Sequence, residues 1–96
     1  MACITIHHEN YNYAFDNGQL LKECLIDANK ERQARILGVA PAPLARLKGE
    51  HRFHILIKAV TRKKLREILD FALHEAQEKM CDLRIINVEI DPVNML

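Results

Sequence analysis

The chain has 96 residues, the usual size of one domain built around one hydrophobic core. Its composition, with 49% hydrophobic residues and only three glycines, excludes disordered and fibrous proteins. The formal net charge of +1 alone suggests no polyanion-binding protein, although this total hides an uneven distribution along the chain.

The first third of the chain predicts a strand followed by a helix. Residues 3–8 are rich in β-branched side chains, as strands are. Asn10 is a good helix N-cap, and apolar residues then recur three and four positions apart, which is the spacing of one buried helix face. This stripe consists of Tyr11, Ala14, Phe15, Gly18, Leu21, Leu25 and Ala28. The polar residues 31–33 are expected to end the helix.

Two further strands are predicted in the middle of the chain. Residues 35–39 form the first, and the run Ala40-Pro41-Ala42-Pro43 is expected to stop its pairing, because each proline lacks a backbone donor. An irregular basic loop then runs to about Gly49. Residues 51–60 form the clearest strand. Its core face carries Phe53, Ile55, Ile57 and Ala59, and its other face carries Arg52, His54, Leu56 and Lys58.

The last third predicts a second helix and a fourth strand. Thr61 is a suitable N-cap for the helix. The buried stripe of the helix is expected to be Leu65, Ile68, Leu69, Ala72, Ala76 and Met80. Residues 84–91 form the strand, with Ile86, Val88 and Ile90 facing inward, and Pro92 stops it.

The predicted order is therefore β-α-β-β-α-β. It folds most simply as an α+β domain with a four-stranded antiparallel sheet and both helices on one face, the ferredoxin-like plan. Residues 1–96 form one domain, because no linker long enough to divide the chain is present. Both ends fall abruptly in structured segments, so we expect a piece of a larger protein.

Basic residues are concentrated in one part of the sequence. Between Leu44 and Arg66 there are eight Lys and Arg residues and a single acidic residue, Glu50. This segment carries +7, so the other residues together carry −6. Such a block indicates either a basic face for an anionic partner or a solvated face without a partner.

Several classes of protein are not indicated by the sequence. Cys3, Cys24 and Cys81 are far apart and contain no C-x-x-C pair, so we expect buried thiols in a reducing cytoplasm rather than a disulfide or zinc framework. Neighbouring histidines diverge on their strands and predict no metal site. No signal peptide and no apolar run of membrane-spanning length is present, so no membrane partner is expected.

Three segments of the chain carry motifs of a known family. The segment 37–48, Leu-Gly-Val-Ala-Pro-Ala-Pro-Leu-Ala-Arg-Leu-Lys, is similar to the signature L-G-P-A-x-A-P-x-x-[RK]-[LI]-[KR] of PriA-type replication-restart helicases, the primosomal protein N′ family. Residues 8–14 resemble its H-E-x-Y-x-x-A opening, and residues 88–92 resemble its terminal V-D-V-D-P. Two positions differ: Val39 stands where proline is usual and His51 where an aromatic residue is usual.

The resemblance implies the carboxy-terminal domain of a 3′–5′ DNA helicase that restarts stalled replication forks and helps to assemble the primosome. It also implies that this domain folds like a small-subunit ribosomal protein. In that family the neighbouring helicase lobes use ATP and magnesium and carry zinc. This chain has no G-x-x-x-x-G-K-[ST] loop, so no cofactor and no enzymatic activity are expected of it alone. The implied partners are branched or single-stranded DNA, the helicase lobes, and the acidic tail of single-stranded DNA-binding protein, SSB.

Charge and resemblance together select the candidate site residues. We expect sequence-tolerant contacts with DNA phosphates from Arg46, Lys48, Arg52, Lys63 and Lys64. Arg62 and Arg66 match family positions near the SSB-tail pocket, where guanidinium groups bind carboxylates. The alternative from another class is a ferredoxin-like domain of a regulatory or metabolic protein that binds a small ligand or dimerises. A free-standing enzyme would need a nucleophile and a base that the sequence does not bring together.

Overall fold

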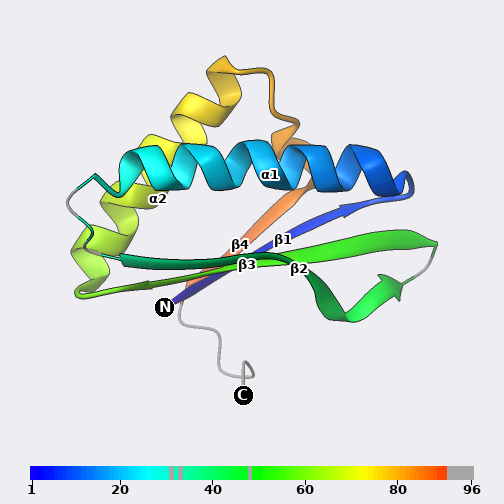
Figure 1. Cartoon of the computed structure of the whole chain (residues 1–96), viewed down its shortest axis with the longest axis horizontal. Helices are drawn as coiled ribbons and strands as arrows, with labels where there is room; N and C mark the ends of the chain where they lie inside the picture. Colours follow the sequence, from blue (N-terminus) through cyan, green and yellow to red (C-terminus); the bar gives the residue numbers. More distant parts are fainter. Residues whose placement is uncertain (31, 33, 48, 91–96) are drawn as a thin grey trace.

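The computed structural model describes residues 1–30, 32, 34–47 and 49–90, with residues 43–47 described by their backbone alone. Its elements follow the order β1 (Ala2–His8), α1 (Tyr11–Ala28), β2 (Ala34–Leu47), β3 (Glu50–Ala59), α2 (Arg62–Glu78), a 3-10 turn η1 (Leu83–Ile85) and β4 (Ile86–Ile90). The four strands form one antiparallel sheet in the order β2-β3-β1-β4. Figure 1 shows α1 and α2 on the same side of this sheet. The predicted fold is confirmed.

The core lies between the sheet and the two helices. In the antiparallel register, Ile4 of β1 pairs with Ile55 of β3, and Ile6 pairs with Phe53, so these side chains share one face. All four are buried. The helices supply the other half of the core with Leu21, Cys24, Leu25, Leu65, Leu69, Ala72 and Ala76. No helix among the described residues covers the opposite face of the sheet.

Both predicted helix starts are confirmed by their caps. The Asn10 side chain accepts a hydrogen bond of 3.0 Å from the Tyr13 backbone N–H. The Thr61 hydroxyl accepts one of 3.1 Å from the Lys64 backbone N–H. These contacts are local in sequence, so N-capping chemistry alone predicts them. The Thr61 cap starts α2 two residues after the end of β3.

The prediction that Ala40–Pro43 ends the second strand is wrong. β2 continues to Leu47, and Pro41 pairs with Phe53. This is possible because β2 is an edge strand, so the missing donor of a proline need not interrupt a ladder on its outer side. The β2–β3 register shifts between Leu37 and Ala40 and again between Pro41 and Arg46. These shifts leave unpaired the residues of β2 that do not fit a regular ladder.

Gly38 makes the first of these shifts possible. Its φ of +124° is one that residues with a Cβ rarely adopt, and a Cβ built there would lie 2.5 Å from the His54 carbonyl oxygen. The next residue, Val39, packs against Gly18 of α1, where a Cβ would lie 3.2 Å from Val39 Cγ1. The bulge therefore anchors the edge strand against the helix layer.

Three smaller predictions also need correction. Met80, predicted in the buried stripe of α2, is 88% exposed, because the helix ends at Glu78 and Met80 takes a left-handed φ of +68°. The Cys81 N–H then bonds to the Ala76 carbonyl, which closes the helix end and turns the chain away. Ile90 is exposed, and β4 begins at Ile86 rather than at residue 84. Residues 91 and 92, the predicted strand end, lie outside the described part of the chain.

The three cysteines are buried, as predicted from their spacing and composition. Burial raises the pKa of the Cys81 thiol to about 11 and also raises the pKa of Cys24. These thiols therefore act as small apolar groups in the core. No helix within the described residues is long and apolar enough to cross a membrane.

Candidate nucleic-acid interface

The sheet face away from the helices is mainly polar. On β3 the residues alternate between the buried Phe53, Ile55 and Ile57 and the partly or fully exposed Arg52, His54 and Lys58. On β1 the same outer face carries Thr5 and His7, which pair with His54 and Arg52. A strand with this alternation presents one row of polar side chains to solvent or to a partner.

Arg52, a predicted DNA contact, lies at the end of the sheet next to the β2–β3 turn. It pairs with His7 of β1, which is itself 3.3 Å from Glu50 through Nδ1. The backbone of Arg46, another predicted contact, pairs with His51 at the same end. The side chain of Arg46 and the whole of Lys48 lie outside the described residues, so the structure gives no position for these two charges.

The remaining predicted residues lie at the start of α2. Arg62, Lys63 and Arg66 are exposed. An α-helix turns about 100° per residue, so Arg66 lies only about 40° round the helix from Arg62, whereas Lys64 lies about 200° from it. Arg62 and Arg66 therefore share one edge of α2, and Lys64 lies on the edge that faces α1.

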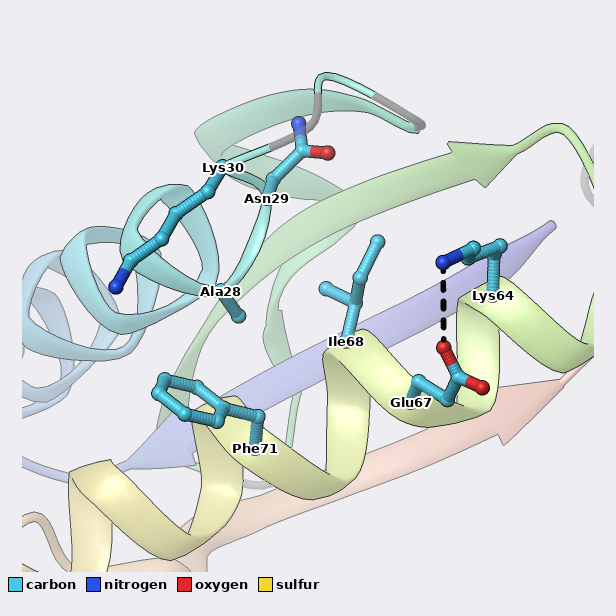
Figure 2. A pocket seen from close by; sticks show the side chains of 7 residues that line it. All are labelled: Ala28, Asn29, Lys30, Lys64, Glu67, Ile68 and Phe71. Atoms are coloured by element: carbon cyan, nitrogen blue, oxygen red, sulfur yellow. Dashed lines mark ion pairs between the residues drawn. The ribbon is translucent and has the colours of Figure 1, made fainter.

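Lys64 borders a cavity of about 250 Å³ between the end of α1 and the first half of α2. Its Nζ atom lies 3.6 Å from Glu67 Oε2, a solvent-exposed pair that contributes little to stability. Figure 2 shows the side chains of Ile68 and Phe71 in the wall of this cavity, with Lys30 contributed by the turn that follows α1. Lys64 thus belongs to a mixed apolar and charged hollow, separate from the Arg62–Arg66 edge.

The structure separates the predicted basic residues into two groups. Arg52 lies near the start of β3, and the backbone of Arg46 pairs with His51 beside it. Figure 1 shows the start of β3 at the right, and α2 begins at the opposite end, after β3 has crossed the sheet. Lys58 lies on the same face as Arg52, roughly 20 Å further along β3 at the rise of a strand. Positively charged side chains therefore lie at both ends of the outer face and do not form one compact patch.

Several side chains that the sequence did not indicate as site residues lie at the two ends of the sheet. Arg35 on β2 pairs directly with Lys58 on β3 at the α2 end. Tyr11, predicted to be core, is 51% exposed at the other end, and its ring lies 5.3 Å from the His51 ring. Alternation along the strand would have placed Arg35 on the polar face, but its cross-strand partner depends on the sheet register.

His54 is the titratable group at the centre of the outer face. Partial burial lowers its pKa, the Arg52 charge lowers it further, and Glu89 on β4 acts in the opposite direction. At neutral pH His54 is therefore uncharged, because its ordinary pKa of 6.5 is already below 7. The positive charge of this face rests on arginine and lysine, with His54 contributing a neutral polar ring.

A protein-family model covers almost the whole chain. The family model described as the primosomal protein N C-terminal domain matches residues 1–93. The chain belongs to this family. The resemblance seen in the motifs at 8–14, 37–48 and 88–92 is thereby confirmed, and with it a connection to the primosome and DNA replication. Comparison with curated proteins finds no match.

As a primosomal protein N C-terminal domain, the chain shows no arrangement of groups for metal binding in its described part. No three His, Cys, Asp or Glu side chains gather there in a way that could hold a metal ion. The candidate site of this family member consists of cations and one neutral histidine on the sheet and at the start of α2, with the half-exposed Tyr11 at the start of α1. Such groups bind anions and stack on planar rings.

Proposed function

We infer that the chain is the DNA-binding and protein-docking domain of a PriA-type 3′–5′ DNA helicase, which restarts stalled replication forks and helps to assemble the primosome. The match of the primosomal protein N C-terminal domain to residues 1–93 carries this proposal. The arrangement of cations at both ends of the uncovered sheet face supports it. A small-ligand or dimerisation domain of a metabolic protein, the alternative, has no comparable support.

The DNA contacts proposed here are directed at phosphates. Among the predicted contacts with described side chains, Arg52 lies at one end of the sheet, and Lys63 and Lys64 lie at the other end, at the start of α2. Arg46 is grouped with Arg52 because its backbone pairs with His51, and Lys48 is grouped with them on the grounds of sequence alone. Long flexible cations neutralise phosphates without reading bases, so binding is insensitive to sequence and weakens with salt. Lys64 is assigned a weaker role, since Glu67 lies beside it.

The docking role is assigned to the start of α2. Arg62 and Arg66 share an edge there, and planar guanidinium groups bind carboxylates through two hydrogen bonds each. The backbone N–H of Lys63 in the first helical turn adds a donor for an anion, whereas the Lys64 N–H already bonds to Thr61. We propose that this edge binds the acidic tail of SSB. The helicase lobes beside the domain would belong to the same parent chain.

Catalysis is assigned to the parent helicase rather than to this domain. ATP and magnesium would be used, and zinc held, by the helicase part of the protein in the cytoplasm. The chain itself contains no loop of the type that cradles nucleotide phosphates. Its contribution is to hold DNA and partners beside that motor.

The proposal is tested by titrating the 96-residue chain against labelled forked and single-stranded DNA of several sequences. We expect weak binding of similar strength for all sequences, and loss of affinity when Arg46 and Lys48 are replaced by alanine. The same preparation is expected to hydrolyse no ATP in the presence of DNA. Lack of binding to every DNA at low salt, or DNA-stimulated ATP hydrolysis by the pure chain, contradicts the proposal.

A further inference from the structure

A second cavity, of about 290 Å³, lies at the end of the sheet where β2 begins and β3 ends. Three cations and three apolar groups line it: Arg32, Arg35, Lys58, Ala34, Ala59 and Val60. The three cations are exposed, and no acidic residue among the described ones contributes to the lining. The charge that the described residues give this cavity is therefore positive.

The pairing of β2 and β3 places two of these cations directly opposite each other. Arg35 pairs with Lys58 in the antiparallel register, one position beyond the pair formed by Ile36 and Ile57. Since side chains alternate between the faces of a sheet, Arg35 and Lys58 both lie on the face away from the helices. Like charges at directly opposite positions destabilise a sheet.

Nothing in the described part of the chain offsets this repulsion with an ion pair. No carboxylate forms a salt bridge with Arg32, Arg35 or Lys58 among the described residues. Arg32 adds its charge from the α1–β2 connection, where its backbone N–H bonds to the Asn29 carbonyl. A bound anion is the group that would convert this repulsion into attraction.

We propose that this cavity binds a backbone phosphate of a nucleic-acid strand. A phosphodiester accepts paired hydrogen bonds from a guanidinium, which two of the three cations provide. The apolar groups Ala34, Ala59 and the 69% exposed Val60 suit the adjoining sugar rather than a small, fully hydrated ion. This inference rests on the proposed DNA-binding function and assigns it a site at the α2 end of the outer face.

The site extends the proposed DNA path. Lys58 lies on the same sheet face as Arg52, roughly 20 Å along β3. A strand held at both points would cross the outer face past His54 and Leu56. Arg35 and Lys58 then act together with Arg52, although they come from different strands and only Arg52 is a site residue that the sequence predicts.

The test compares Arg35→Gln, Lys58→Gln and the double variant with Lys22→Gln, which removes one charge from α1 in the helix layer. The first measurement is the change in melting temperature when chloride is replaced by inorganic phosphate at constant ionic strength. The second is the affinity for a labelled oligothymidine at several salt concentrations. Each cavity variant is also expected to melt no lower than the wild type without phosphate, because the repulsion is relieved.

For the wild type and Lys22→Gln we expect phosphate to raise the melting temperature and oligothymidine to bind. The double variant should lose the phosphate effect and about tenfold in affinity. Its slope of log K against log salt should be shallower by about 0.7 for each DNA phosphate that the variant no longer neutralises.

Two results overturn the inference in different ways. If the double variant keeps the wild-type slope and phosphate response while the wild type binds DNA, the cavity is not a phosphate site and the DNA-binding function stands. If phosphate stabilises the wild type through Arg35 and Lys58 but no oligonucleotide binds, the cavity is a site for free phosphate. That second result overturns both the nucleic-acid assignment and the proposed function.

Discussion

The phenol of Tyr13, in the first turn of α1, donates a hydrogen bond of 2.8 Å to the carboxylate of Asp82, which precedes β4. Asn17, one turn further along α1, accepts a hydrogen bond of 2.9 Å from the Asp82 backbone N–H and donates one to the Tyr13 carbonyl. Arg84 contacts the same carboxylate at 3.0 Å. These four residues fix the start of α1 to the segment that leads into β4.

Acid should weaken this cluster in a defined pH range. The hydrogen bonds from Arg84 and then Tyr13 lower the pKa of Asp82 from 3.8 to about 2. A carboxyl group with a lowered pKa in the folded state contributes stability above its unfolded pKa and loses it as the pH falls through the folded value. We therefore expect this contribution to be complete above about pH 5 and to disappear between roughly pH 4 and pH 2.

The measurement is the melting temperature of wild type and Asp82→Asn across that range. Asp82→Asn should melt lower than wild type at neutral pH, and the difference should shrink as the pH falls to about 2. Asp70→Asn, which changes an exposed carboxylate on α2, is the matched control and should follow the wild-type curve. A constant gap between Asp82→Asn and wild type at every pH would show that Asp82 contributes by packing alone.

Gly38 should be intolerant of any side chain. Gly38→Ala introduces a Cβ 2.5 Å from the His54 carbonyl and forces alanine to a φ of +124°. We expect a loss of about 3 kcal/mol in the free energy of unfolding, measured by urea denaturation. Gly49→Ala is the control, because Gly49 has a φ of +81° but no atom within 4 Å of an added Cβ, so it should lose only about 1 kcal/mol. Equal losses in the two variants would contradict the steric account of the bulge.

The outline of this fold could be predicted because it depends on local signals. The stripes at 3.6-residue spacing and the N-caps Asn10 and Thr61 define both helices within one or two residues. The length of β2 could not be predicted, since a proline is excluded from a central strand but tolerated at an edge. Whether residues 34–47 form an edge strand is decided by the pairing of strands distant in sequence.

The candidate site was less predictable for the same reason. A cluster of positive charge in the sequence, residues 44–66, becomes two separated groups because β3 crosses the sheet between them. The opposed pair Arg35 and Lys58 requires the β2–β3 register, and that register shifts at Gly38. Net charge along the chain therefore indicates an anionic partner but does not locate the residues that bind it.

The edge formed by Arg62 and Arg66 predicts a selective effect on docking. In the proposed full-length parent protein, the Arg62→Ala, Arg66→Ala double variant should bind an SSB-tail peptide at least about tenfold more weakly than wild type, because two carboxylate-binding guanidinium groups are removed. The isolated domain should bind the peptide weakly, with a smaller decrease on substitution. Arg62→Ala alone should change folding stability by less than about 0.5 kcal/mol, as exposed substitutions usually do.

The control for this experiment is Lys22→Ala, which removes a charge from α1 instead of α2. It should bind the tail peptide as wild type does. If the double variant and wild type bind the peptide with equal affinity, the α2 edge has no part in docking, whereas the proposal for DNA is unaffected.

The central claim is that cations at both ends of the sheet, Arg52 on β3 and Lys63 at the start of α2, neutralise DNA phosphates. Its most direct test is the slope of log K against log salt for single-stranded DNA, measured for wild type, Arg52→Ala, Lys63→Ala and Lys22→Ala. We predict steep salt dependence for the wild type and Lys22→Ala, with the slope reduced by about 0.7 in each of the other two variants. An affinity that does not change with salt, or slopes identical in all four proteins, would contradict the account.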